Sequence, residues 1–538
     1  MNPTEWPRIR VESHFGDRVV KCFEKRAQTL YQLLEKACEI NPHGIALVCE
    51  ESQLSYSELR RDSSLLAQRM SLEGIKPGDR IALLLNNRIE FVVALFAITA
   101  IGAICVPLSV REQKTGIKFA LTHSKASMVI HESNLAQLLP TQEEAPSLRF
   151  KLSIQTCESS QSYADWIEID NNEAQHAAFT PFACDEEDTA IILYTSGTTG
   201  LPKGAMLSHF GLVHSSMHYK FSFNLSHTDC AIATVPLSHV TGVVALITCV
   251  IMAGAKLVIM PNFKAAHFIS LAQVHAMTYT LMVPAMYNLC LLDPLFEKTD
   301  LSNWRVGAFG GAPMPVATIE QLVGKIPKLI LLNCYGSTET TSPSTLMPKG
   351  ETLRHLDSVG QALPCVEIRT MDSQGRELAV GELGEIWIKG PMVVKGYWDN
   401  LEATRTNFVG GFWRSGDLGS IDEKGYLKVV DRIKDMINRG GYKIYTIEVE
   451  NVLYQHPSVL ECAVVSKPCP VLGERVHAFI TLKGELVKES TLKEFCAQHL
   501  ADYKVPESFS ISKELLPRNA NGKLLKRDLR NKITPFTA

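Results

Sequence analysis

The sequence predicts an α/β protein with a large N-terminal domain of layered α/β sheets, a β-rich subdomain and a small α+β C-terminal domain. Three observations lead to this prediction. Helix-like and strand-like patterns alternate as far as residue 340, short strands separated by glycines follow from about Val366, and a new βα alternation begins after Lys434. A chain of 538 residues also exceeds what one hydrophobic core usually organises.

The first helix and strand of this alternation have clear local signals. Ser55 and Glu58 have the spacing of a capping box, and apolar residues then recur on one helical face. Gly74 and Pro77 predict the end of this helix, and residues 81–85 predict the strand that follows.

Two apolar runs resemble membrane spans in composition. Residues 91–108 approach the necessary length, but Gly102 interrupts the run and the part that ends at Pro107 is rich in β-forming residues. We therefore predict a buried helix followed by a buried strand. Residues 243–255 form a shorter run, for which we predict the same arrangement.

The later parts of the chain differ in pattern. Residues 140–188 are polar and predict surface-exposed connecting structure. Residues 381–390 and 396–398 predict short strands with tight turns. Residues 459–465 and 476–482 predict strands of the small C-terminal domain. The predicted boundaries are 1–432 for the N-terminal domain, about 366–432 for its β-rich subdomain, and 433–538 for the C-terminal domain.

Composition excludes some functional classes. Lys and Arg total 54 against 57 for Asp and Glu, and the formal charge of −3 argues against nucleic acid as the main partner. The 14 cysteines are scattered and none has the C-x-x-C spacing of a zinc or dithiol site. The first ten residues lack the apolar stretch of a secretory signal, so we expect a cytoplasmic enzyme with reduced thiols and no transmembrane segment.

The strongest chemical signal is the run Tyr194–Gly204, which follows an apolar stretch. Its glycines free backbone N–H groups, and its hydroxyls and lysine add donors, which suits the oxygens of a triphosphate. The run lacks the Gly-Lys-Ser/Thr of a Walker loop and is not a dinucleotide-binding pattern. The alternative, a polar hairpin without a ligand, explains so long an ordered run poorly. The predicted phosphate-binding residues are Thr195, Ser196, Gly197, Thr198, Thr199, Gly200 and Lys203.

Five further motifs follow in order along the chain. They are residues 236–239 (PLSH), 333–340 (NCYGSTET), 413–418 (WRSGDL), 431–434 (DRIK) and 517–523 (PRNANGK). With the phosphate loop, they resemble the signatures of the adenylate-forming superfamily, which contains acyl-CoA synthetases, peptide-synthetase adenylation domains and firefly luciferases. The chain most resembles a fatty-acyl-CoA ligase, and the resemblance covers residues from about 25 to 530.

The resemblance implies that the chain makes an acyl-adenylate from ATP and a carboxylic acid. Tyr335 would stack on adenine, Thr338 would donate a hydrogen bond to the α-phosphate, and Glu339 would bind Mg²⁺ through a carboxylate oxygen. The other nucleotide-binding residues that it implies in this part of the chain are Gly311, Asn333 and Gly336.

The resemblance also implies roles near the domain boundary. Asp417 and Arg432 would contact the ribose, and Lys523 would neutralise charge while the acid attacks the α-phosphorus. The C-terminal domain would be mobile and rotate about Lys434 between the two half-reactions.

After this rotation, the loop 439–443 would face coenzyme A. Gly440, Gly441 and Lys443 are its implied CoA-binding residues, and Gly441 would leave room for the pantetheine arm. Some family members carry glutamine at the position of Lys443. The resemblance therefore implies that Lys443 lies in this loop, but it does not imply what its side chain does.

The acid is predicted not to be an α-amino acid. Amino-acid-activating relatives place an aspartate near residues 234–246 to bind the ammonium group, and this segment contains no carboxylate. By resemblance, His239 would lie near the acyl carboxyl. Small residues at 310–312 leave room for a chain, so we predict a fatty acid, and an aryl acid would also fit. Four apolar residues either line this pocket or pack in the core: Val243, Val244, Met282 and Pro284.

Four alternatives stay open. The acceptor could be a separate carrier protein instead of coenzyme A, or the chain could be a catalytically silent ATP-binding protein or a membrane-surface protein. Retention of Lys203, Glu339 and Lys523 argues against a silent protein, and the sequence has no basic amphipathic run. His214 and His218 have the i, i+4 spacing of a metal clip but no third ligand nearby in sequence. A homo-oligomer stays open as well.

Overall fold

A computed structural model describes residues 6–167, 179–195, 202–312, 314–518 and 524–533. Tertiary contacts divide the chain into two units. The first contains residues 1–356, 360–367 and 388–413, and the second contains residues 357–359, 368–387 and 414–538. The fold class is α/β, as predicted. The predicted domain boundary at residue 433 stays a prediction.

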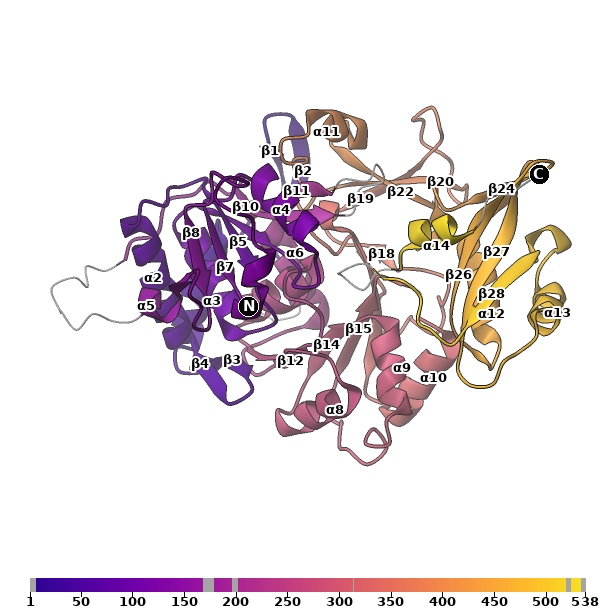
Figure 1. Ribbon diagram of the computed structural model, residues 1–538, viewed down its shortest axis with the longest axis horizontal. Helices are drawn as coiled ribbons and strands as arrows, with labels where there is room; N and C mark the ends of the chain where they lie inside the picture. Colours follow the sequence, from indigo (N-terminus) through magenta and orange to yellow (C-terminus); the bar gives the residue numbers. More distant parts are fainter. Residues whose placement is uncertain (1–5, 168–178, 196–201, 313, 519–523, 534–538) are drawn as a thin grey trace. The chain divides into compact units, whose positions relative to one another are not determined.

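The first unit is built on two large sheets and a hairpin (Figure 1). The seven-stranded sheet has the order β11 (Lys203–Ser208), β10 (Thr189–Thr195), β6 (Ile104–Pro107), β5 (Arg80–Leu84), β7 (Met128–His131), β8 (Phe150–Ser153) and β9 (Gln161–Ser162). The nine-stranded sheet has the order β18 (Gln361–Ala362), β17 (Thr345–Leu346), β16 (Ile330–Tyr335), β15 (Val306–Gly310), β14 (Tyr279–Met282), β12 (Cys230–Ala233), β13 (Lys256–Ile259), β3 (Ile45–Cys49) and β4 (Ser52–Ser55). The hairpin pairs β1 (Ile9–His14) with β2 (Arg18–Phe23).

The helices of this unit cover both sheets and fill the space between them. They are α1 (Leu30–Ile40), α2 (Tyr56–Leu72), α3 (Ile89–Ala100), α4 (Lys114–His123), α5 (Ala164–Ile167), α6 (His209–Phe223), α7 (Cys249–Ala253), α8 (Ala265–Val274), α9 (Pro284–Leu292), α10 (Val316–Lys325), α11 (Leu401–Asn407), η1 (Ser133–Leu138), η3 (Thr241–Thr248) and η4 (Thr338–Thr340). Helix α3 contacts β3 of one sheet and β5 and β6 of the other, so it lies between the sheets.

Local sequence signals explain the start of this fold. The predicted capping box at Ser55 and Glu58 is present at the start of α2, and Leu59, Leu66 and Met70 are fully buried. The apolar run at residues 91–108 forms the buried helix and strand that we predicted, α3 and β6. Searched over the residues described, the structure contains no helix long and apolar enough to cross a membrane.

Two expectations about secondary structure were wrong. The polar segment 140–188 is not only connecting structure, because β8 and β9 extend the seven-stranded sheet from β7. Residues 396–398 form no strand and make only an isolated bridge from Tyr397 to Ala205. Both depend on contacts with distant residues, which local patterns do not show.

The run 243–255 forms the buried helix that we predicted. It begins as the π-helix η3, continues as α7 and ends at Gly254, before strand β13.

The second unit contains two sheets, of which the second is mixed because β28 runs parallel to β27. The first sheet has the order β19 (Glu367–Met371), β20 (Gly384–Lys389), β22 (Phe412–Ile421) and β21 (Phe408–Val409), with β23 (Leu427–Arg432) on β22, and some of its residues belong to the first unit. The second has the order β25 (Tyr442–Ile444), β24 (Ile437–Arg439), β27 (Gly473–Leu482) and β26 (Val459–Cys469), with β28 (Ser508–Ser512) on β27. Its helices are α12 (Thr446–Gln455), α13 (Glu489–His499), α14 (Lys526–Lys532) and η5 (Asp502–Lys504). The predicted strands at 459–465 and 476–482 are confirmed as parts of β26 and β27.

Helix α6 buries the two histidines that we considered as a metal clip. The Phe23 N–H donates to His214 Nε2 at 3.2 Å, and His214 Nδ1 lies 2.8 Å from the Phe210 carbonyl. His218 Nε2 lies 2.8 Å from the Pro364 carbonyl. The bonds with Phe23 and Pro364 tie the helix to neighbouring segments, so the two rings serve the core of the first unit.

These buried histidines predict a loss of stability in mild acid. Burial lowers the pKa of His209 and of His218 to about 4, and that of His214 to about 3. In the unfolded chain a histidine has a pKa of about 6.5, so the unfolded state binds protons first as the pH falls. Each histidine should therefore cost about 2 kcal/mol of unfolding free energy at pH 5 relative to neutral pH.

Chemical denaturation at pH 7 and pH 5 measures this loss. His214→Gln keeps an acceptor and a donor in the same place without a titrating ring, so it should reduce the pH dependence. His43→Gln, at an exposed position, is the matched control. An unfolding free energy that does not change between the two pH values would contradict the prediction.

Candidate active site

The candidate site begins at one edge of the nine-stranded sheet. Strands β14, β15 and β16 run parallel, so their carboxyl ends at Met282, Gly310 and Tyr335 lie on the same edge. Ligands of open α/β sheets bind at this edge. The structure therefore brings together the predicted nucleotide residues Gly311, Asn333, Tyr335 and Gly336.

Close packing of two strands explains why position 310 is a glycine. A Cβ atom at this position would overlap the carbonyl oxygen of Cys334, on the neighbouring strand β16. The absence of a side chain thus lets β15 and β16 approach each other, and does not by itself indicate an acyl pocket. Gly311 next to it has a φ of +78°, in the left-handed region that favours glycine. Pro313 lies outside the described residues.

Glu339 is held in a fixed position after β16. It lies in the short helix η4, and its side chain is 7% exposed. The Ser337 hydroxyl donates to its Oε2 at 2.6 Å, and the Tyr397 hydroxyl donates to its Oε1 at 3.0 Å. Two hydroxyl donors therefore orient the carboxylate that the sequence assigns to Mg²⁺. Thr338, the predicted α-phosphate donor, is half-buried beside it.

Thr195 connects this site to the other sheet. It is the last residue of β10, and its hydroxyl donates to Glu339 Oε1 at 3.4 Å. Lys203 pairs with Thr195 as the first residue of β11, so both ends of the predicted phosphate loop lie beside Glu339. The loop residues Ser196 to Gly200 lie outside the described part of the chain. The phosphate loop and the Glu339 motif, far apart in sequence, are thus brought to one place.

Tyr397 is a site residue that the sequence analysis missed. Its ring lies 5.1 Å from Lys203 Nζ, and its hydroxyl bonds Glu339. Burial, followed by the charge of Glu339, raises the pKa of Tyr397, which keeps its hydroxyl a neutral donor. The only sequence signal was the Gly-Tyr-Trp run at residues 396–398, which we had interpreted as a strand.

His239 precedes the π-helix η3 and is half-buried. Its Nδ1 lies 3.3 Å from the Thr241 hydroxyl, and the Thr241 N–H donates to it at 3.4 Å. A Cβ at Gly242 would overlap the Pro236 backbone, so this glycine allows the tight approach of the turn. Helices of the π type are rare and occur often at functional sites. The role of His239 at the acyl carboxyl stays a prediction.

The apolar residues considered for the acid pocket are core residues. Val243, Val244 and Met282 are fully buried within hydrophobic clusters of the first unit, and Pro284 is the first residue of α9. Packing therefore explains their apolar character.

In the second unit, Asp417 and Arg432 face each other across β22 and β23. Arg432 Nε lies 3.3 Å from Asp417 Oδ1. Asp417 is buried, whereas the Arg432 side chain is 41% exposed. The structure thus joins two residues that the resemblance assigned to one sugar, while their contact with a ribose stays a prediction.

Asp431, the first residue of the motif at 431–434, has a structural role. Its carboxylate accepts the Thr446 hydroxyl at 3.1 Å and the Thr446 N–H, at the start of α12. Burial raises the pKa of Asp431. The motif at residues 431–434 therefore anchors α12 to β23, and Lys434, the predicted hinge, follows directly on this anchor.

Gly440 and Gly441 form the tight turn between β24 and β25. Their φ values are +57° and +95°, and Arg439 pairs with Tyr442 across the turn. A two-residue hairpin with two positive φ values requires glycine-like residues, so the turn alone explains both glycines. Lys443 is exposed on β25. Contacts of this loop with coenzyme A stay a prediction, and Lys523 lies outside the described residues.

Comparison with known proteins decides the family. Residues 34–398 match the model of the AMP-binding enzyme family, and residues 448–523 match that of the AMP-binding enzyme C-terminal domain. The chain belongs to the AMP-binding enzyme family. This confirms the resemblance to adenylate-forming enzymes.

Relatives of this AMP-binding enzyme match it along nearly the whole chain. A long-chain-fatty-acid–CoA ligase of Mycobacterium tuberculosis is 31% identical over 511 residues, which cover 93% of this chain and 98% of the relative. A feruloyl-CoA synthase of an Amycolatopsis species is 32% identical over 501 residues, with 93% and 98% covered. The structure of o-succinylbenzoate CoA synthetase from Bacillus subtilis with its acyl-adenylate intermediate has a TM-score of 0.81 and 27% identity, and covers 94% of this chain and 98% of that one.

Glu339 of this AMP-binding enzyme fits a Mg²⁺ ligand. A carboxylate offers about four acceptor positions, and hydroxyl groups of Thr195, Ser337 and Tyr397 use three of them. Mg²⁺ commonly takes one or two carboxylates and completes its shell with water and phosphate oxygens. One oriented carboxylate is therefore sufficient as the protein's ligand for Mg²⁺.

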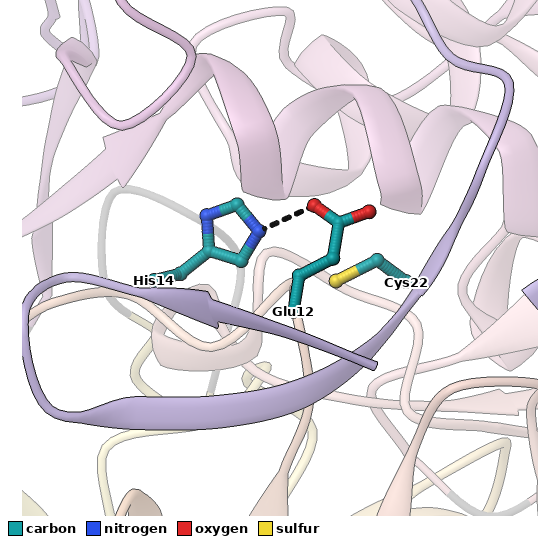
Figure 2. A group of neighbouring side chains, drawn as sticks. All are labelled: Glu12, His14 and Cys22. Carbon is teal, nitrogen blue, oxygen red and sulfur yellow. Dashed lines mark hydrogen bonds and ion pairs between the residues drawn. The ribbon is translucent and has the colours of Figure 1, made fainter. Parts of the chain in front are cut away.

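Another group of ligand-type side chains does not suit a metal. Among the residues that the structure describes, Glu12, His14 and Cys22 bring ligand atoms within 4.8 Å of one another (Figure 2). The Glu12 carboxylate is already paired with Arg26 at 2.7 Å, and His14 binds Glu12 and Glu187 through both ring nitrogens. Burial raises the pKa of the Cys22 thiol to about 12. The group is a closed ion-pair network beside a protonated thiol.

Proposed function

We propose that this AMP-binding enzyme is an AMP-forming acyl-CoA ligase that activates a hydrophobic carboxylic acid. The observation that best supports this proposal is the position of Glu339. Glu339 follows β16, and it accepts a hydrogen bond from Thr195 at the end of β10, where the phosphate loop begins. This junction provides hydroxyl donors, a lysine and a carboxylate in one place, as binding of a metal-bound triphosphate requires.

In the first half-reaction, a carboxylate oxygen of the acid attacks the α-phosphorus of ATP and pyrophosphate leaves. Two anions approach each other, so groups that hold and neutralise the phosphates supply much of the catalysis. In this proposal Thr195 and Lys203 contact phosphate oxygens, and Glu339 would hold Mg²⁺. When bound, Mg²⁺ offsets the negative charge of the triphosphate.

In the second half-reaction, the thiol of coenzyme A attacks the acyl carbonyl carbon and AMP leaves. The substrate carboxylate and the incoming thiol supply both nucleophiles, so no residue of the chain forms a covalent intermediate. Exchange of Lys523 for the Gly440–Gly441 turn at the site, about the hinge at Lys434, accounts for both steps in one enzyme.

The acid is a fatty acid in this proposal, with aryl acids as the second class. The wall at residues 234–246 carries no carboxylate to pair an ammonium group. The relatives named above have names that refer to a long-chain fatty acid, ferulate and o-succinylbenzoate, none of which has an α-amino group.

AMP release with Mg-ATP and a panel of fatty and aryl acids, with and without coenzyme A, tests the proposal. A thioester that forms only with coenzyme A, identified by mass, is the expected product. Acyl-adenylate that accumulates without turnover would favour a carrier-protein acceptor. No adenylate from any acid would contradict the proposal and favour a silent ATP-binding protein.

Amino acids should not support ATP–pyrophosphate exchange. An unpaired ammonium group in an apolar pocket costs several kcal/mol, which makes exchange undetectable beside that of a good acid. Phenylalanine and 3-phenylpropionate form a matched pair that differs only in the α-amino group. Comparable exchange with both would contradict the predicted pocket.

A further inference from the structure

Arg18 is a buried cation that binds a segment next to the candidate active site. It is the first residue of β2 and is 7% exposed. Its guanidinium donates to the carbonyl oxygens of three consecutive residues. Nη1 lies 3.1 Å from the Val393 oxygen and 2.9 Å from the Val394 oxygen, and Nη2 lies 3.1 Å from the Lys395 oxygen. The rigid fork of a guanidinium can serve several acceptors at once in this way.

These bonds fix the backbone at residues 393–395. Three carbonyl dipoles that point to one place repel one another, and a cation among them offsets this repulsion. The rings of Phe15 and Phe408 lie 5.3 and 5.8 Å from the central carbon of the guanidinium, which restricts its position further. Loss of the guanidinium would leave buried carbonyl groups without their donor, which is unfavourable. We therefore expect the segment to shift or loosen when Arg18 is replaced.

The same segment continues into the contacts that orient Glu339. The Val394 N–H donates to the Glu339 carbonyl at 3.0 Å, and the Tyr397 hydroxyl donates to the Glu339 carboxylate at 3.0 Å. The Trp398 N–H donates to the Gly204 carbonyl at 2.7 Å, which ties the segment to β11 as well. A shift at residues 393–395 would therefore change the position of a hydroxyl donor of the carboxylate.

We infer that Arg18 is a positioning residue of the active site, which holds residues 393–398 so that Tyr397 orients the Glu339 carboxylate. Arg18 lies outside the motifs of the sequence and before residues 34–398, which match the family model. All of these residues belong to the first unit. The inference rests on the proposed function, because that function gives Glu339 the role of a Mg²⁺ ligand.

ATP–pyrophosphate exchange over a range of Mg²⁺ concentrations tests the inference. Arg18→Met should lower the rate about tenfold, as Tyr397→Phe should, and should raise the Mg²⁺ concentration that gives half of the maximum rate. A variant that only lost stability would lower the rate without changing this concentration, because its folded fraction keeps the native site. Arg18→Lys keeps a cation with one donor nitrogen, so its rate should lie between those of Arg18→Met and wild type.

A double-mutant cycle tests whether Arg18 acts through Tyr397. The double variant Arg18→Met, Tyr397→Phe should lose about tenfold, close to each single variant, because both changes break one chain of contacts. Independent effects would give about a hundredfold loss and would overturn the inference. Lys21→Met removes an exposed cation from the same strand and is the matched control. It should keep the wild-type rate, and a loss equal to that of Arg18→Met would also overturn the inference.

Hydrogen exchange measures the position of the segment without turnover. In Arg18→Met, the amides of Val394 and Tyr397 should exchange faster than in wild type, whereas those of β5, in the centre of the seven-stranded sheet, should not change. Unchanged protection at residues 393–398 would overturn the inference whether or not the enzyme activates an acid, so its failure is seen separately from a failure of the proposed function. Faster exchange together with a wild-type Mg²⁺ dependence would overturn it as well.

Discussion

Glu339→Gln should reduce the rate of acyl-adenylate formation by about 100- to 1,000-fold, the usual effect of removing one preorganised electrostatic group. Glutamine fills the same volume but is neutral and a much weaker ligand for Mg²⁺. Two of the three hydroxyl groups that orient Glu339 come from other motifs, Thr195 and Tyr397. The carboxylate therefore connects the two sheets, in addition to the Mg²⁺ ligation that we propose for it.

ATP–pyrophosphate exchange as a function of Mg²⁺ concentration measures this effect. The variant should require more Mg²⁺ and still reach a lower maximum rate. Tyr397→Phe keeps the ring beside Lys203 but removes one hydroxyl donor, and we expect a loss of about tenfold. Asp229→Asn is the matched control, because Asp229 is also a buried carboxylate but lies before β12, at the opposite edge of the sheet, where it pairs with Arg305 at 2.8 Å. Exchange within threefold of wild type in Glu339→Gln would contradict the assignment.

Lys523→Ala should slow adenylate formation by about 100- to 1,000-fold and change thioester formation from preformed acyl-adenylate much less. The resemblance assigns Lys523 to the first half-reaction only, because it would neutralise charge at the α-phosphate and then leave the site. Separate assays of pyrophosphate exchange and of thioester formation from synthetic acyl-adenylate measure the two steps.

Lys513→Ala, at an exposed position in the same unit, is the control for loss of a lysine. Equal losses in both half-reactions of Lys523→Ala would contradict the alternation of the C-terminal domain. A loss confined to thioester formation would show that Lys523 acts in the second half-reaction and not in the first.

Local features of the fold were predictable because neighbouring residues produce them. The capping box at Ser55 satisfies backbone donors within one turn, so its spacing identifies the start of α2. Gly102, with a φ of +71°, lies between α3 and β6, where the sequence predicted that a glycine ends the buried helix. Strands β26 and β27 were predictable because runs of β-branched residues pair as antiparallel neighbours.

The parts that were missed depend on distant contacts. Strands β8 and β9 lie in a polar segment and exist because β7 offers a free edge. Tyr397 looked like part of a strand, and only the fold shows that its hydroxyl reaches Glu339. The π-helix at Thr241–Thr248 likewise depends on the close approach of Gly242 to the Pro236 backbone.

By itself, the sequence determined the family and the chemical identity of the candidate site. The motifs consist of contiguous residues whose hydroxyls, glycines and charges suit phosphate wherever the chain places them. Only the tertiary structure decided which motifs meet. Thr195 ends β10 of one sheet and Glu339 follows β16 of the other, and their contact requires that the carboxyl ends of β10 and β16 converge. Such convergence arises from packing both sheets on a shared layer of helices, which local periodicity does not encode.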